Sequence, residues 1–100
     1  MPSKMIMRWD IRIEKDSEYS EFFVHEFIPG LNKLGVVEIQ VWFTQYGDCE
    51  QIMASGIANT LADMKKVLDS DEWELLSGRL EEYVKEFSLK IVSATGGFQV

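Results

Sequence analysis

Apolar and polar residues alternate in several stretches of the chain, which is typical of β-strands because successive side chains point to opposite faces. Residues 5–14, 36–46 and 89–94 follow this pattern. Gly47-Asp48 has the composition of a two-residue hairpin turn with glycine at its first central position. The chain is therefore expected to return after this turn as a further strand over residues 51–58.

The predicted turn also fixes which residues of the hairpin face each other. Apolar residues then meet apolar or small ones, and a slip by one residue would destroy that match. The expected pairs are Thr44 with Gln51, Phe43 with Ile52, Trp42 with Met53, Val41 with Ala54, Gln40 with Ser55, Ile39 with Gly56, Glu38 with Ile57 and Val37 with Ala58.

Between the strands, apolar residues recur at helical spacing. The pattern predicts a first helix over residues 17–34, with a kink or looser turns at Pro29-Gly30, because proline lacks an amide donor and clashes one turn back. It predicts a second helix in two pieces, capped by Asn59 or Thr60 and capped again near residues 69–71, that runs to about Phe87.

The order β-α-β-β-α-β is that of the ferredoxin-like split βαβ fold. Right-handed crossovers then give a four-stranded antiparallel sheet in the order 4-1-3-2, with the helices on one face. The length suits one α+β domain over residues 1–100.

The two faces of this sheet differ in character. The face expected under the helices is uniformly apolar: Trp9, Ile11, Ile13, Val37, Ile39, Val41, Phe43, Ile52, Leu89 and Ile91. The other face mixes Arg8, Asp10, Arg12, Glu38, Gln40 and Lys90 with the large apolar residues Ile6, Trp42, Met53, Ile57 and Val92.

Such an apolar patch is larger than monomers usually expose, and each well-buried side chain would contribute about 1.5–3 kcal/mol. We therefore expect a homodimer that pairs the open sheet faces. Charges of both signs on this face are expected to neutralise one another across strands. The predicted interface residues are Arg8, Asp10, Arg12, Gln40, Trp42 and Met53.

Composition narrows the classes of partner. The net charge of −7 repels a phosphate backbone, so nucleic-acid binding is not expected. No apolar run approaches about 18 residues and no signal peptide is recognisable, so we expect a cytoplasmic protein without a membrane partner. The single cysteine, Cys49, cannot form an intramolecular disulfide.

Three segments carry a family resemblance: residues 26–35 of the first helix, the broken helix over residues 61–87 with its junction at 70–73, and the closing strand at 88–92. In these the chain resembles the dimeric α/β-barrel superfamily, which pairs two ferredoxin-like sheets into one barrel. The resemblance implies a homodimer. It does not select a chemistry, because members include cofactor-free monooxygenases, haem-degrading enzymes, isomerases, ligand-sensing domains and proteins of unknown function.

A row of small residues, Ala54, Gly56 and Ala58, lies on the face expected under the helices. One interpretation is that a helix approaches the sheet closely there. The other is a pocket for a flat apolar or aromatic ligand. The predicted ligand-binding residues are Trp9, Phe23, Phe27, Ala54, Gly56, Trp73 and Tyr83.

Few residues suggest catalysis. His25 and Tyr83 are the candidate proton handlers of a cofactor-independent oxygenase or isomerase, although a surface role is the simpler reading of His25. The haem-degrader set of asparagine, tryptophan and histidine is not matched, and no metal or cofactor is expected. Residues considered and set aside are Cys49 as a nucleophile, Asp69, Asp71 and Glu72 as calcium ligands, and Thr95-Gly96-Gly97 as a phosphate loop.

Three hypotheses about function therefore stay open: a dimeric barrel that binds a small apolar or aromatic molecule, a cofactor-independent monooxygenase or isomerase, and a purely structural dimerisation module.

Overall fold

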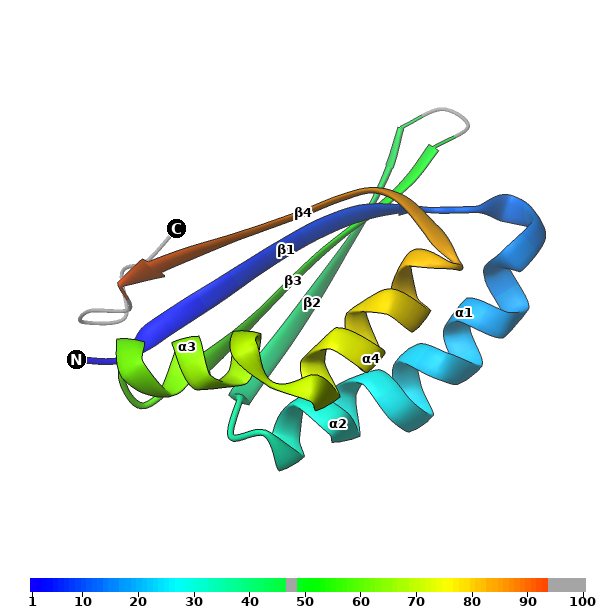
Figure 1. Cartoon of the computed structure of the whole chain (residues 1–100). Coiled ribbons are helices and arrows are strands. Elements are labelled where there is room, and N and C mark those ends of the chain that lie inside the picture. Colours follow the sequence, from blue (N-terminus) through cyan, green and yellow to red (C-terminus); the bar gives the residue numbers. More distant parts are fainter. Residues whose placement is uncertain (47–48, 94–100) are drawn as a thin grey trace.

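The computed structural model describes residues 1–46 and 49–93, without the side chains of residues 13, 45–46 and 49–50. A layer of strands lies over a layer of helices (Figure 1). The expected turn at 47–48 and the glycine pair at 96–97 lie outside the described residues. The elements are β1 (Ser3–Ile11), the 3₁₀ turn η1 (Ile13–Lys15), α1 (Asp16–Phe22), the π-helical turn η2 (Phe23–Phe27), α2 (Ile28–Lys33), β2 (Val37–Tyr46), β3 (Cys49–Ala58), α3 (Leu61–Asp69), α4 (Asp71–Glu81) and β4 (Val84–Ser93).

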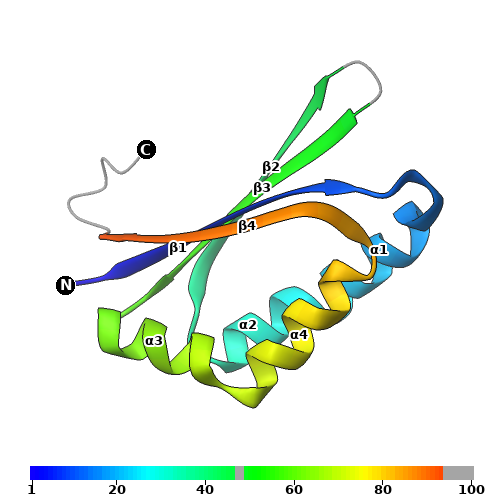
Figure 2. The same cartoon turned by 45° about the horizontal axis from the view of Figure 1, so that its top comes forward.

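The sheet has the order β2-β3-β1-β4, and all its neighbours are antiparallel. This is the predicted order read from the other edge, so the predicted β-α-β-β-α-β fold is confirmed. All the helices lie on one side of the sheet (Figure 2). Among the described residues, no helix has the length and apolar character that a membrane crossing requires.

The predicted hairpin register is confirmed where it was most specific. Phe43 pairs with Ile52 and Trp42 with Met53. It is wrong at the start of β2, where Val37 pairs with Ile57 and not with Ala58. Glu38 has a φ of 51° at this point, and a bulge of this kind places an extra residue in one strand and shifts every pair beyond it.

The first helix runs almost as predicted, but its irregularity precedes the proline. The segment Phe23–Phe27 is a π-helical turn, closed by a hydrogen bond from the Ile28 amide to the Phe23 carbonyl. Pro29 follows in the first turn of α2, where its missing amide matters least. A wider turn accommodates the proline ring, which would otherwise clash with the carbonyl four residues earlier.

The second helix is broken as predicted, and side chains cap both pieces. The Thr60 hydroxyl accepts a hydrogen bond from the Asp63 amide (3.0 Å), and the Ser70 hydroxyl accepts one from the Trp73 amide (3.1 Å).

The end predicted for this helix is wrong. It stops at Glu81 instead of near Phe87, and β4 already begins at Val84. Val84 and Lys85 pair with the end of β1, so pairing in the sheet prevails over the apolar spacing that suggested more helix. Phe87 therefore reaches the core from a strand.

The expected covering of the sheet is correct at its centre and wrong at its edge. Trp9, Ile11 and Ile52 are buried, whereas Val41 and Phe43 are 42% and 56% exposed. The hairpin of β2 and β3 extends beyond the helices, so the far part of β2 has no helix over it (Figures 1 and 2). Val37, also expected to be covered, is exposed because the bulge gives it Ile57 as its neighbour.

Candidate functional site

Trp9 lies at the centre of a buried aromatic cluster between β1 and the first helix. Its side chain is fully buried. The rings of Tyr19, Phe23 and Phe27 meet it edge-on at centroid distances of 6.4, 5.9 and 6.2 Å. The Phe87 ring stacks on it at 6.1 Å with an interplanar angle of 8°. Both arrangements are favourable for aromatic pairs, so the cluster is a well-ordered part of the core.

The cluster contains one polar contact. The Trp9 indole Nε1–H donates to the Tyr19 hydroxyl over 3.3 Å. Burial raises the pKa of Tyr19 to about 12, because the charged phenolate would be poorly solvated there. The Tyr19 phenol is therefore neutral near pH 7 and can donate or accept a hydrogen bond, but it is not a base at that pH.

The sequence-predicted aromatic residues do come together. Trp73 packs on Phe27 (6.2 Å between centroids), and Tyr83 packs on Phe22 (5.5 Å). Tyr83 is only half-buried and lies at the edge of the cluster. The sequence reasoning missed three members of the cluster: Tyr19, Phe22 and Phe87. Tyr19 precedes Phe23 by one helical turn, and Phe87 had been assigned to the helix.

The row of small residues on β3 has a close neighbour. A Cβ added to Gly56 would overlap Cγ1 of Val36, the fully buried residue that precedes β2. Ala54 and Ala58 on either side are buried as well. The first of the two interpretations of the small-residue row was that a helix approaches the sheet closely. At Gly56 there is such a close approach, but it comes from the start of β2 and not from a helix. That Ala54 and Gly56 bind a ligand stays a prediction.

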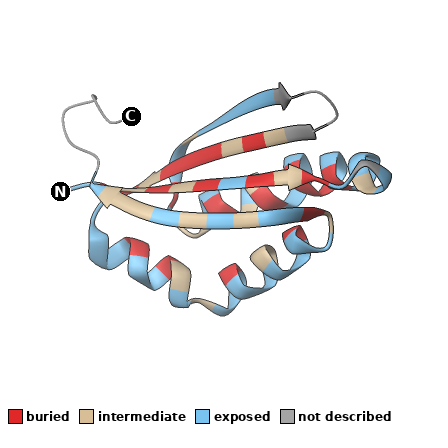
Figure 3. Cartoon of the chain, turned by 90° about the horizontal axis from the view of Figure 1, so that it is seen from above, coloured by how far each residue is buried: buried red, intermediate tan, exposed pale blue. Residues whose placement is uncertain are grey.

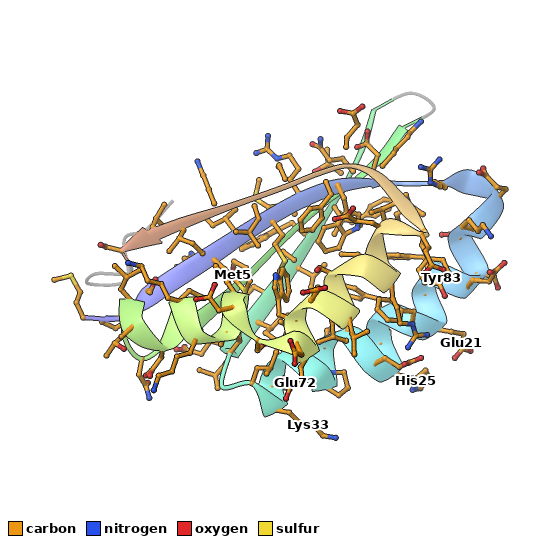
Figure 4. The ribbon with its side chains drawn as sticks, viewed as in Figure 1. Met5, Glu21, His25, Lys33, Glu72 and Tyr83 are labelled. Carbon is orange, nitrogen blue, oxygen red and sulfur yellow. The ribbon has the colours of Figure 1, made fainter. Side chains whose placement is uncertain are left out.

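The two candidate proton handlers lie in different surroundings. His25 and Glu21 are exposed on the outer side of the helix layer, with 3.4 Å between Nε2 of His25 and Oε2 of Glu21 (Figure 4). The structure does not bring His25 to the aromatic cluster, where its predicted role requires it. Tyr83 reaches the edge of the cluster but has no histidine beside it.

An ion pair joins the two long helical elements next to Tyr83. The Arg79 guanidinium donates to both carboxylate oxygens of Glu26 and lies 4.8 Å from the centre of the Phe22 ring. The hydrogen bond that Arg79 donates to Glu26 raises the pKa of the guanidinium above its usual value. Because these side chains are half exposed, the pair adds little stability, and its effect is to orient α4 against η2.

The sheet face away from the helices carries five of the six predicted interface residues, because Arg12 lies beyond the end of β1. Direct partners on neighbouring strands share a face, and Trp42, Met53 and Arg8 form one such row across β2, β3 and β1. Trp42 is 45% exposed, and Met53 is half-buried. Figure 3 shows the sheet in the view from above, with exposed and half-buried positions along its strands.

A shallow groove lies on this open face between β1 and β4. It has a volume of about 250 Å³ and is lined by Ile6, Arg8, Ser88, Leu89 and Lys90. Sequence reasoning had named Arg8 and Lys90 for this face but not Ser88. Among residues 1–46 and 49–93, no three histidine, cysteine or acidic side chains gather in a way that suits a metal ion.

Comparison with known proteins identifies the fold. No protein-family model matches the sequence, and no curated protein sequence matches it. SnoaB, a cofactor-independent oxygenase from Streptomyces nogalater, matches 97% of this chain and 96% of its own at 10% identity with a TM-score of 0.76.

Two further structures match over a similar length. An EthD-family protein from Bacillus halodurans matches 95% of this chain and 100% of its own at 14% identity and a TM-score of 0.72. A dimeric protein of unknown function and ferredoxin-like fold from Bacteroides fragilis matches 93% and 96% at 16% identity and a TM-score of 0.71. At these identities the likeness concerns the fold alone. The chain has the ferredoxin-like fold seen in structures of the dimeric α/β-barrel type.

Proposed function

We propose that this protein is a homodimer that pairs the open faces of two sheets into one barrel. The observation that carries the proposal is the position of Trp42, which is 45% exposed beside Met53 with no helix over this face. The half-buried side chains of Ile6, Ile57 and Val92 extend the apolar surface over the other strands.

Packing against a second copy would bury these groups. Each side chain that becomes well buried contributes about 1.5–3 kcal/mol relative to exposure. A protein of the same fold from Bacteroides fragilis is described as dimeric, which supports the proposal.

Light scattering after size-exclusion chromatography tests the dimer directly. We expect wild-type protein at twice the mass of the 11.5 kDa chain, and Trp42→Glu shifted towards monomer because a carboxylate would be desolvated in the interface. Leu75→Glu is the matched control, since Leu75 is 69% exposed on α4, on the other side of the molecule. An unchanged dimer mass for Trp42→Glu would contradict the face assignment.

The dimer is proposed to bind a small apolar or aromatic molecule at the aromatic cluster. The support is chemical: Trp9, Phe23, Phe27 and Trp73 offer ring faces and edges, and the Trp9–Tyr19 pair offers one polar contact for orientation. Tyr83, half-buried at the edge of the cluster, lies where a ligand would enter. Because the rings pack closely, the ligand has to displace some of these contacts.

Native mass spectrometry of freshly purified protein is the test. We expect a mass excess that corresponds to one small molecule per chain and that is lost or reduced in Trp73→Leu. The control is Leu75→Ala, which leaves the cluster intact. A protein without any mass excess, and without heat of binding when titrated with indole in a calorimeter, would favour the purely structural dimer.

A cofactor-independent oxygenase is the second candidate. The likeness in fold to SnoaB and to a putative antibiotic biosynthesis monooxygenase from Nitrosomonas europaea favours it. The surroundings of the proton handlers do not, because His25 lies outside the cluster, paired with Glu21, and Tyr83 has no histidine beside it. If the protein consumes oxygen with an aromatic substrate and Tyr83→Phe abolishes the reaction, this candidate replaces the binding protein.

A further inference from the structure

The open face of the sheet is basic, although the chain as a whole is acidic. At the paired positions of this face, β1 and β4 carry Lys4, Arg8, Lys85 and Lys90 against a single acid, Asp10. Glu86 is also exposed, at the bulge of β4, so these two strands carry a net charge of +2, on a chain whose total is −7.

The even mixture of charges expected from the sequence is therefore not what this face has. The acid expected on β2, Glu38, sits at the bulge at the sheet edge, and Arg12 lies beyond the end of β1. At distances shorter than the ~10 Å screening length, a small anion at this face is affected by the local positive charge more than by the acidic helices on the far side.

Two of these basic side chains, Arg8 and Lys90, line the groove between β1 and β4 together with Ser88. Arg8 and Ser88 are direct partners, and Lys90 pairs with Ile6, which places Lys90 diagonally across from Arg8. Diagonal neighbours on a sheet are within reach of long side chains. Among the side chains that the structure describes, no carboxylate lies within salt-bridge distance of Arg8 or Lys90.

We propose that this groove binds an amphipathic carboxylate, meaning a small organic acid with an aliphatic or aromatic body. The carboxylate oxygens accept hydrogen bonds from the Arg8 guanidinium, the Ser88 hydroxyl and the Lys90 ammonium group. A guanidinium can contact a carboxylate through two parallel hydrogen bonds, which makes Arg8 the main determinant. The body of the ligand lies on Ile6 and extends along the row of Met53 towards Trp42.

In one respect this inference rests on the proposed dimer, because the second sheet is what covers the groove. Two faces of the same positive charge repel each other when they approach. An anion bound between them reduces this repulsion, so the ligand and the partner copy stabilise the same assembly. Binding of the acid is then expected to shift the equilibrium towards the dimer.

Isothermal titration with octanoate tests the site, and octanamide serves as the uncharged probe of the same shape. We expect Arg8→Gln to bind octanoate at least tenfold more weakly than wild type, as for loss of a charged hydrogen bond. The wild-type protein should bind octanamide at least tenfold more weakly than octanoate. Lys33→Gln removes the same charge from α2 on the helix side and should leave octanoate affinity unchanged.

Equal affinity for octanoate and octanamide would overturn the proposal, as would an Arg8→Gln variant that binds octanoate like wild type. Light scattering on the same samples separates this failure from that of the dimer. A dimer without preference for the carboxylate removes the anion site alone. A monomer that binds octanoate through Arg8 removes the dimer and keeps the site.

Discussion

The two faces of this sheet use the same residue type for opposite purposes. Trp9 on the covered face is fully buried, ringed by aromatic side chains, and its indole N–H has the Tyr19 hydroxyl as acceptor. Trp42 on the open face is 45% exposed beside Met53. A tryptophan in the sheet is thus a core residue where the helices reach it and an exposed residue, available to the proposed interface, where they do not.

The start of β2 shows the same contrast between adjacent residues. Val36 is fully buried over Gly56, whereas Val37 is 45% exposed. The bulge at Glu38 places an extra residue between Val37 and Gln40, so Val37 lies on the face opposite to the one that strict alternation along β2 predicts. Burial in this molecule follows the local path of the chain and not hydrophobicity alone.

The largest effect is expected from removing the covered tryptophan. Trp9→Ala should lower the free energy of unfolding by about 3–5 kcal/mol, because it leaves a cavity and takes the donor from Tyr19. This loss should be independent of protein concentration. In the proposed dimer Trp42 lies in the interface, so the stability lost in Trp42→Ala should depend on protein concentration. Urea unfolding at two protein concentrations measures both. Equal, concentration-independent losses would break the contrast between the two faces.

A smaller loss of stability is expected from a substitution at Gly56, which tests how closely the covered face is packed. Gly56→Ala should cost about 1–3 kcal/mol, because the new methyl group overlaps Val36 and the strand core is already filled. The double variant Gly56→Ala/Val36→Ala should lose less than the sum of the two single variants.

Gly78 provides the matched control for that experiment. It lies within α4 with no heavy atom within 4 Å of an added Cβ. Gly78→Ala should therefore stabilise the protein by about 0.5–1 kcal/mol. If thermal unfolding shows Gly56→Ala to be neutral or stabilising, the space above β3 is open and the pocket interpretation regains its basis.

A pH-dependent effect of similar size concerns the polar contact of the aromatic cluster. The pKa of Tyr19 is raised to about 12 in the folded protein against 10.0 for the free group. The contribution of Tyr19 to the free energy of unfolding is fully present below pH 10 and is lost as the pH rises towards 12. Between these two values the phenol ionises in the unfolded chain but stays neutral in the folded protein. Between pH 9 and pH 11 this amounts to about 1.4 kcal/mol at most. Unfolding curves of Tyr19→Phe should lack that part of the pH dependence, and identical curves would place Tyr19 in contact with solvent.

The local pattern of apolar and polar residues was sufficient to predict much of this fold. Alternation located strands near Trp9, Trp42 and Ile91, and helical spacing with Thr60 and Ser70 as caps located the helices. The register of Phe43 with Ile52 also followed, because a side-chain period of two leaves one match between apolar residues. The aromatic residues of the candidate site were found for the same reason, since Phe23, Phe27 and Trp73 lie on the apolar faces of their helices.

The features that the sequence pattern did not predict depend on contacts between segments that are distant in the chain. Phe87 has helical spacing with Tyr83, yet pairing of β4 with β1 takes it into a strand. Val41 and Phe43 alternate like core residues, yet no helix reaches the end of the hairpin. The basic groove exists because β1 and β4, separated by most of the chain, place Arg8 opposite Ser88. The sequence by itself determined the elements and the strand order, because side-chain periodicity is local. Only the tertiary structure decided which surfaces are covered, because coverage depends on the lengths and ends of elements that meet in space.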